Sequence, residues 1–419
     1  MIGRTSISPR SGLSSEQEHR SAADSRRDQV AKRSQILGNG DLLEVGMHWT
    51  PGSGGVDRYF HGLMSAFHAT QVPVQALAFD GEQMEITRHT KYRSLGSKQL
   101  GCMERMRRLR KSARIFETET VNDRVIATHF ALYALPLIGQ LWKSRHVVHF
   151  HGPWADEALE QGGRPHVVLA KRSIERLVYS TGKRFITLSD AFKGVLMKRF
   201  GVAGDRIEVI PGGVDAGSFS VAMTQAAARD QLHWPRDRRI VLCVRRLISR
   251  MGLEQLIEAL CDVRRREPEV LFLIAGEGEL HQNLESKISE LGLGHWARLL
   301  GFVPDSDLAM AYRAADLSIV PSQSLEGFGL VTLESLAAGT PVLVTPVDGL
   351  PEAVAGLSKS LVLDGTTSSD IAQGLVLAMA GGIPLPSESE CADYVRKNFD
   401  WSVIAPRVLR VYRPSNHLF

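Results

Sequence analysis

Short apolar runs alternate along this chain with longer segments in which apolar residues recur every three or four positions. The runs predict buried strands, and the longer segments predict amphipathic helices. The first run, residues 42–47, is followed by a glycine-rich loop at residues 50–55 and then by a helical pattern that ends near Phe67. A strand, a glycine turn and a helix in this order begin a parallel α/β unit.

The alternation forms two series, separated by a poorly patterned stretch after Asp215. Alternating strands and helices build parallel sheets covered on both faces. The predicted fold class is therefore α/β, with two Rossmann-like doubly wound domains and a ligand cleft at the carboxyl ends of both sheets. Further strands are expected at residues 124–127, 146–150, 184–188 and 207–210, and then at 240–244, 270–275, 298–300, 317–320 and 341–345.

Composition sets the outer limits of these domains. Residues 1–36 contain hardly any large apolar residue, so we expect a disordered tail. Residues 37–213 are predicted to form the first domain and residues 214–399 the second, which leaves 400–419 as a terminal segment.

The formal charge of +4 is divided unevenly, because residues 1–212 carry +10 and the remainder carries −6. The basic half indicates an anionic partner, which could be membrane lipid, an acidic acceptor or nucleic acid. The four cysteines are widely spaced, which argues against a disulfide framework or a zinc site. No apolar run is long enough for a membrane span or a secretory signal, so we expect a cytoplasmic protein.

The most specific segment, residues 321–342, places a glycine-rich loop between a strand that ends at Pro321 and a helix that begins near Leu330. The free N–H groups of such a helix start form an anion site suited to a diphosphate. Glu326 in the loop and Glu334 on the helix could then accept hydrogen bonds from hydroxyl-rich groups on either side of the phosphates.

With this Glu-x7-Glu spacing the chain resembles the retaining glycosyltransferase family four, whose fold is called GT-B, over roughly residues 40–415. The resemblance implies that Glu326 contacts the donor sugar near the reaction centre and that Glu334 holds the ribose. It further implies that the backbone amides of Gly329, Leu330 and Val331 bind the diphosphate. The segment from Phe399 to Tyr412 resembles the terminal helix that returns to cover the first domain in this fold.

A second element, residues 244–252, carries cations between a strand and a helix. In the family this element reads Gly-Arg-Leu, three variable residues and Lys-Gly, and its Arg and Lys neutralise the leaving nucleotide. Arg246 and Gly252 fit the pattern, whereas Arg245 replaces the glycine and Met251 replaces the lysine. We expect Arg250 to supply the missing charge, because a guanidinium binds phosphate in a bidentate manner; the alternative is an exposed arginine-rich turn with one lost contact.

In the first half, His149 and His151 end a strand and face the same side of it. The resemblance points to His151 as a ligand of the donor sugar, and His149 is expected to be a core residue. A His-x-His metal site is the alternative, but such a site is expected to lack a third ligand nearby. His129, which also ends a strand, either lines the acceptor side or packs in the core.

Glycines at 52, 54 and 55 follow the first strand and would let the donor or the acceptor approach the backbone closely, so Gly54 and Gly55 are candidate donor-binding residues. The loop matches neither the Walker A nor the dinucleotide fingerprint. Phe302 follows a later strand and corresponds to the nucleobase pocket of the family. Asp307 is interpreted as a helix N-cap rather than as part of an Asp-x-Asp metal site.

Together these residues predict a metal-independent, cofactor-free retaining transfer from a nucleoside-diphosphate sugar to a carbohydrate or lipid-linked acceptor in polysaccharide or glycolipid synthesis, without nucleic acid. Arg246 and the helix amides would stabilise the diphosphate, while Glu326 and His151 would hold the sugar. Two other hypotheses stay open at this point: a sugar-nucleotide epimerase or phosphorylase on the same fold, and a weakly catalytic protein that binds sugar nucleotides or polyanions.

Residues 103–116 predict an amphipathic helix with a strongly basic face. Such a helix could lie on an anionic membrane, which would make the protein peripheral on the inner face of that membrane. Equally, it could pack on the sheet of the first domain with its basic face in solvent.

Overall fold

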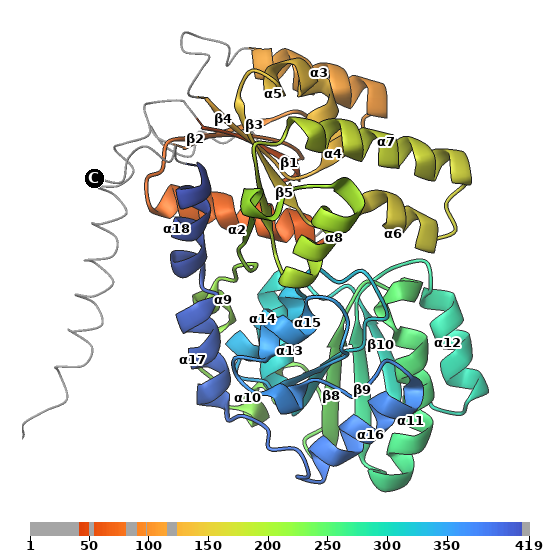
Figure 1. Cartoon of the computed structure of the whole chain (residues 1–419). Coiled ribbons are helices and arrows are strands. Elements are labelled where there is room, and N and C mark those ends of the chain that lie inside the picture. Colours follow the sequence, from red (N-terminus) through yellow and green to blue (C-terminus); the bar gives the residue numbers. More distant parts are fainter. Residues whose placement is uncertain (1–41, 50–53, 81–89, 98, 115–123, 413–419) are drawn as a thin grey trace, which may run out of the picture.

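The computed structural model describes residues 42–49, 54–80, 90–97, 99–114 and 124–412. Two parallel sheets with helices on both faces lie one above the other in Figure 1. This architecture confirms the predicted fold class. The predicted disordered tail and Gly52 lie outside the described residues.

The first sheet has seven parallel strands in the order β3-β2-β1-β4-β5-β6-β7. Residues that alternate along each strand face opposite sides, so that Leu42 packs in one apolar cluster and Leu43 in another. Helices α3, α4, α7 and α8 cover one face, and α2 with α18 covers the other. The strands are β1 (Leu42–His48), β2 (Val74–Phe79), β3 (Thr90–Ser94), β4 (Val125–Thr128), β5 (Arg145–Phe150), β6 (Arg184–Thr187) and β7 (Ile207–Val209).

The second sheet has five parallel strands in the order β10-β9-β8-β11-β12. Every residue of β9, β11 and β12 is buried, as expected for strands that are covered on both faces of a sheet. One face packs on α11 and the other on α13. The strands are β8 (Arg239–Val244), β9 (Val270–Ala275), β10 (Ala297–Gly301), β11 (Leu317–Val320) and β12 (Val342–Val344).

The helices connect these strands in sequence order. In the first domain they are α2 (Gly55–Ala69), α3 (Cys102–Arg114), α4 (Ala131–Ala134), η2 (Leu135–Leu137), α5 (Ile138–Leu141), α6 (Trp154–Glu160), α7 (Pro165–Thr181), α8 (Asp190–Phe200) and η3 (Gly204–Arg206). In the second they are α9 (Ala216–Phe219), α10 (Gln225–Gln231), η4 (Ser249–Met251), α11 (Leu253–Arg266), α12 (His281–Glu290), α13 (Asp305–Ala314), α14 (Leu330–Ala337), α15 (Leu350–Val354), η5 (Lys359–Leu361), α16 (Ser368–Met379) and α17 (Glu388–Asn398), and the terminal helix is α18 (Trp401–Tyr412).

Every strand expected from the sequence is present, with each end within one residue of its expected position. Two further strands, β2 and β3, were not predicted. The prediction that Asp307 is a helix N-cap is wrong, because α13 already begins at Asp305, with Pro304 in the N-cap position. Asp307 lies in the first turn, where a carboxylate still stabilises the helix through its dipole.

The terminal helix α18 packs on α2, next to which it runs in Figure 1. Its first residue, Trp401, is buried between two glycines from different parts of the chain. A Cβ atom on Gly62 would lie 2.2 Å from the indole ring, and one on Gly213 would lie 2.5 Å from it. Both positions therefore need glycine for the indole to reach the first domain.

Candidate active site

The loops that follow β5, β8 and β11 meet between the two domains. From the first domain Glu157, on α6, reaches across to Arg250 of the second, with Nη2 and Oε1 3.4 Å apart. Ser324 likewise contacts Glu160 of the first domain. The segment that begins at His151 and the loop that carries Glu326 thus lie on opposite sides of one interdomain cleft, as expected for a doubly wound fold.

The loop between β11 and α14 holds Glu326 in a fixed position. The N–H of Glu326 donates to Asp348 Oδ2 at 3.1 Å, and its carbonyl accepts from the N–H of Gly349 at 3.1 Å. The preceding residue, Leu325, has a φ of 52°, which is costly for a residue with a side chain. Such strain is typical of functional loops whose surroundings fix one conformation.

Arg245, at the end of β8, contacts the carboxylate of Glu326 directly. Its guanidinium donates to Glu326 Oε2 and, at 2.7 Å, to Ser322 Oγ. Burial acts to raise the pKa of Glu326, but the charge and hydrogen bond of Arg245 outweigh it, so the net shift is downward. Glu326 is therefore an anion held by a cation inside the cleft.

The helix α14 begins at Leu330, as predicted, and Gly329 precedes it with a φ of 75°. A Cβ atom on Gly329 would lie 2.5 Å from Leu350 Cδ2, so this turn requires glycine. The first N–H groups of a helix have no partners within it, which makes the start formed by Gly329, Leu330 and Val331 a potential anion site.

Glu334 lies one turn further along α14 and is buried. Arg58, on α2 of the first domain, donates to Glu334 Oε1 at 3.1 Å and to Asp305 at 2.5 Å. Tyr312 donates to the other oxygen of Glu334 at 3.4 Å. Burial raises the pKa of Glu334, and the charge of Arg58 opposes this only in part. Glu334, the residue predicted to bind the ribose, is thus paired with Arg58 of the opposite domain.

The other two arginines of the β8 loop differ in their surroundings. Arg250 is nearly buried, and it donates to Leu325 O at 2.8 Å while it pairs with Glu157. Arg246 is exposed, and its side chain makes none of the hydrogen bonds or ion pairs found among the described residues. The surrounding protein nevertheless removes part of the water around its guanidinium, and this desolvation and the nearby charge of Arg250 lower the pKa of Arg246. Arg245 and Arg250 are thus each paired with a carboxylate, while the guanidinium of Arg246 has no ion pair among the described residues and can meet an anionic ligand.

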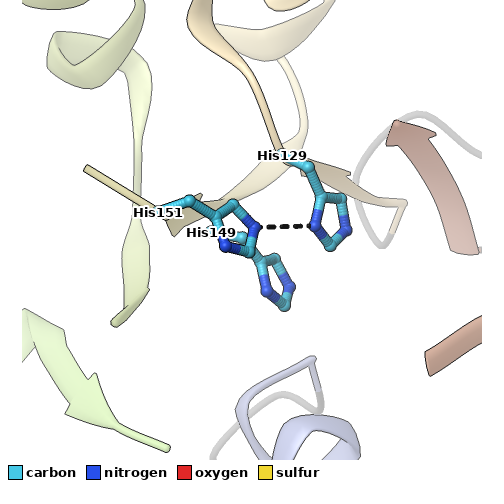
Figure 2. Close-up of side chains that lie close together, drawn as sticks. All are labelled: His129, His149 and His151. Carbon is cyan, nitrogen blue, oxygen red and sulfur yellow. Dashed lines mark hydrogen bonds between the residues drawn. The ribbon is translucent and has the colours of Figure 1, made fainter. Parts of the chain in front are cut away.

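His151 takes part in a cluster of three imidazoles (Figure 2). Its Nε2 lies 3.1 Å from Nδ1 of His129, and the ring of His149 stacks on that of His129 with centroids 4.2 Å apart. Beyond them, Glu44 shares a hydrogen bond of 2.9 Å with His129 Nε2. Tyr412 donates to Glu44 at 2.6 Å and accepts from His149 at 2.5 Å.

Burial keeps this cluster neutral. It lowers the pKa of His129 to about 3, and it lowers those of His149 and His151 well below the usual value, with a further contribution from the neighbouring imidazoles. The same effect raises the pKa of Glu44 to about 8, although the hydrogen bond from Tyr412 opposes it. A neutral His151 can donate to or accept from a sugar hydroxyl without adding charge.

The expectation that His149 and His151 lack a third ligand is wrong, because nitrogen atoms of His129, His149 and His151 lie within 4.8 Å of one another. The three ring planes, however, are only 17–20° apart. A metal ion binds an imidazole nitrogen in the plane of the ring at about 2.0–2.1 Å, so stacked rings cannot share one ion unless they turn. The observed arrangement fits a hydrogen-bonded chain better than a metal centre.

The remaining candidates lie at the margins of the cleft. Gly54, with a φ of 151°, precedes α2, and Gly55 is its first residue; a Cβ atom at either would meet nothing within 4 Å. Phe302 follows β10 and is 53% exposed, which leaves its ring available for stacking. A cavity of about 1480 Å³ opens behind the cleft, where Arg58 and Glu334 meet α18; neither Glu326 nor His151 lines it.

Sequence reasoning missed the groups that hold these residues in place. Arg58, Glu157 and Glu44 come from distant segments, and their contacts depend on how the two domains meet. His129 was considered in the sequence for the acceptor side or the core, and its closeness to His149 and His151 could have been found, because β4 and β5 are adjacent parallel strands whose carboxyl ends lie together.

Two family models match consecutive parts of this chain. "Glycosyltransferase Family 4" matches residues 53–217, and "Glycosyl transferases group 1" matches residues 224–398. These segments correspond to the two domains of the structure.

Curated relatives share about 30% of their residues with the chain. A D-inositol 3-phosphate glycosyltransferase of Segniliparus rotundus is 29% identical over 66% of this chain and 64% of its own length. An uncharacterized glycosyltransferase of Methanocaldococcus jannaschii is 30% identical over 54% of this chain and 59% of its own length. The chain thus spans roughly three fifths of the length of these relatives.

Solved structures match over a larger part of both chains. A sucrose-phosphate synthase from Thermosynechococcus elongatus has a TM-score of 0.74 at 23% identity, over 89% of this chain and 98% of the other. Anabaena HepE in complex with UDP-glucose has a TM-score of 0.70 at 18% identity, over 88% and 98%. At these identities the likeness shows the fold.

Proposed function

Because this chain belongs to glycosyltransferase family four, we propose that it transfers a sugar from a nucleoside-diphosphate donor to an acceptor hydroxyl with retention of configuration. The observation that supports this most directly is the meeting of the Glu326 carboxylate, a cluster of arginines and the start of α14 in one cleft. Together they offer a sugar ligand beside a diphosphate site.

The proposed chemistry is a substitution at the anomeric carbon. The bond from this carbon to the diphosphate breaks, a bond to the acceptor oxygen forms on the same face, and the acceptor proton passes to the leaving phosphate. Arg246, with the amides of Gly329, Leu330 and Val331, stabilises the charge that develops on the diphosphate. Glu326 and His151 hold the sugar, and Glu334 binds the ribose after it releases Arg58.

This reaction needs neither a metal ion nor a cofactor, because arginines and helix amides perform the charge neutralisation that a metal would otherwise supply. The acceptor is a carbohydrate or a lipid-linked saccharide, so the enzyme acts in polysaccharide or glycolipid synthesis. Names of similar proteins support this class: one neighbour is described as a glycosyltransferase involved in lipopolysaccharide biosynthesis.

The test is a matrix of UDP-, GDP- and ADP-sugars against saccharide and lipid-linked acceptors, with EDTA in a parallel series. We expect release of nucleoside diphosphate only with an acceptor, a product of unchanged anomeric configuration and no effect of EDTA. Turnover of the donor without release of nucleoside diphosphate would indicate an epimerase instead. Donor binding without transfer to any acceptor would indicate a binding protein.

We further propose that the basic face of α3 brings the enzyme to an anionic membrane. Leu109 and Ala113 are buried against the first domain, so the helix does pack on that domain. Its outer face remains available, and Met103 is 72% exposed there. None of the helices that the structure describes is long and apolar enough to cross a bilayer. Arg108 is exposed too but pairs with Glu104, and the four exposed cations of this helix without an ion pair among the described residues are Arg107, Arg110, Lys111 and Arg114.

Co-sedimentation with vesicles tests this surface. Each cation contributes about 1 kcal/mol near an anionic bilayer, so changing all four to Gln should abolish binding to vesicles that contain phosphatidylglycerol. The control removes four exposed cations from the second domain, and it should bind like the wild type. Equal binding of both variants, or no binding of the wild type at low salt, would refute the proposal. The control positions are Arg265, Arg266, Arg396 and Lys397.

A further inference from the structure

Arg245 stands where the family pattern has glycine, and its side chain turns into the cleft rather than toward solvent. Only 6% of the side chain is exposed. The guanidinium is surrounded by Ser322, Met251 and Glu326, all of which approach the same nitrogen, Nη2. These partners fix the position of the guanidinium, because burying a charged group without a partner is unfavourable.

Met251, where the pattern has lysine, is the residue under this guanidinium. Its side chain is nearly buried, and its Sδ lies 2.6 Å from Arg245 Nη2. Lysine and methionine share an unbranched side chain, and the lysine ammonium lies two bonds beyond the atom that corresponds to Sδ. The guanidinium of Arg245 therefore lies within reach of the ammonium that a lysine at position 251 would carry.

We propose that the two departures from the family pattern are one exchange, in which Arg245 supplies the donor-site cation that a lysine at 251 would otherwise provide. The inference rests on the proposed function and deepens it. In this assignment Arg245 holds Glu326 and contacts the donor phosphates. Arg250, by contrast, acts as a positioning residue that binds Leu325 and Glu157.

The hydrogen bonds of the two arginines support this division of roles. Arg250 directs one nitrogen to the carbonyl before Glu326 and the other to the opposite domain. The Nε atoms of both arginines are buried without a hydrogen-bond partner among the described residues, but Arg245 directs all its bonds from Nη2, whereas Arg250 uses both terminal nitrogens. A buried donor without a partner is unfavourable, and an acceptor oxygen from a ligand would remove that cost.

The exchange also changes what the site can bind at once. A guanidinium has five N–H donors in a planar fork, whereas an ammonium has three on one point charge. Arg245 can therefore donate to the Glu326 carboxylate from one edge of its guanidinium while it donates to a phosphate oxygen from another edge. The side chain of Arg245 thereby links the Glu326 carboxylate, which faces the sugar, to the diphosphate leaving group.

The experiment is an exchange series with Arg245→Gly, Met251→Lys, the double variant and Arg245→Gln, measured by calorimetry with UDP, GDP, ADP and inorganic pyrophosphate. Arg245→Gly and Arg245→Gln should weaken binding of the preferred nucleotide and of pyrophosphate by a similar factor, about tenfold to a hundredfold. Met251→Lys alone should also weaken binding, because two cations then compete for one space. The double variant should recover most of the lost affinity, so that the effects are non-additive.

The control is Arg265→Gln, which removes a cation that is 72% exposed on α11 and should leave all affinities unchanged. Melting curves identify any variant that fails to fold, in which case Arg245→Gln against the wild type decides the question. Unchanged affinity in Arg245→Gln, or a folded double variant no better than Arg245→Gly, would overturn the exchange while the proposed function stands. A wild type that binds none of the three nucleotides would overturn the proposed function and the exchange together.

Discussion

The hydroxyl of Tyr412 connects the last turn of α18 to the histidine cluster, and its removal gives a defined loss of stability. Tyr412 is fully buried, donates to Glu44 and accepts from His149. In Tyr412→Phe the ring still fills its space, but one oxygen of Glu44 and Nε2 of His149 lose their partner. Both side chains are almost completely buried, so bulk water does not reach the two groups.

The expected magnitude follows from these two groups. Each buried polar group left without a partner costs about 1–3 kcal/mol, so the variant should lose about 2–6 kcal/mol of unfolding free energy. For domains of this size, that corresponds to a fall in melting temperature of at least about 4 °C. His149 has no alternative bond to form, since its Nδ1 is also buried without a partner among the described residues.

The assay is thermal and urea unfolding of the wild type, Tyr412→Phe and a matched control. Tyr394→Phe serves as the control, because that hydroxyl lies in a partly buried site and bonds backbone groups only, among them Ala353 O at 3.1 Å. We expect the control to lose only about 0.5–1.5 kcal/mol. A Tyr412→Phe variant as stable as the wild type, or no less stable than Tyr394→Phe, would refute the reasoning.

Three further predictions concern the cleft and its support. Glu326→Gln should reduce transfer at least a hundredfold, by about 3 kcal/mol or more, while nucleoside diphosphate binds nearly as before; turnover at the wild-type rate would exclude the proposed role. Glu334→Ala should weaken donor binding by about 1.5–3 kcal/mol, measured by calorimetry against unchanged binding of pyrophosphate, which has no ribose. Because burial raises the pKa of Glu44 to about 8, its contribution to stability is full below its usual pKa near 4.5 and is lost as the pH rises through about 8. Glu44→Gln stays neutral, so its melting temperature relative to the wild type should increase between these pH values; a constant difference would contradict the assignment.

Much of the fold could be predicted because buried parallel strands leave continuous apolar runs in the sequence. The strand β9 and the helix start at Leu330 are placed as expected for this reason. The strand β3 was missed because it lies at the edge of the sheet and is mostly polar, with the sequence Thr-Lys-Tyr-Arg-Ser. An edge strand pairs on one side only and needs less apolar surface.

The candidate site was predictable only where residues lie close together in the sequence. The spacing of Glu326 and Glu334 reflects one loop and one helix turn, and both residues lie beside the cleft. The direction of the Arg245 side chain could not be read in this way, because it depends on Ser322 and Glu326, more than seventy positions away. Similarly, the pairing of Arg58 with Glu334 depends on the closeness of the two domains.

The chain crosses between the domains twice, and the two crossings lie side by side. Val214 in the first crossing and Asp400 in the second form a parallel β-bridge, and Trp401 packs beside Gly213. Two adjacent connections resist twisting of one domain relative to the other, which a single linker would allow. The domains can therefore separate mainly by rotation about the line that passes through both crossings. The opening of the cleft is therefore a hinge motion with essentially one degree of freedom. A disulfide that joined the two crossings would leave this motion intact, whereas a disulfide across the mouth of the cleft would abolish the motion.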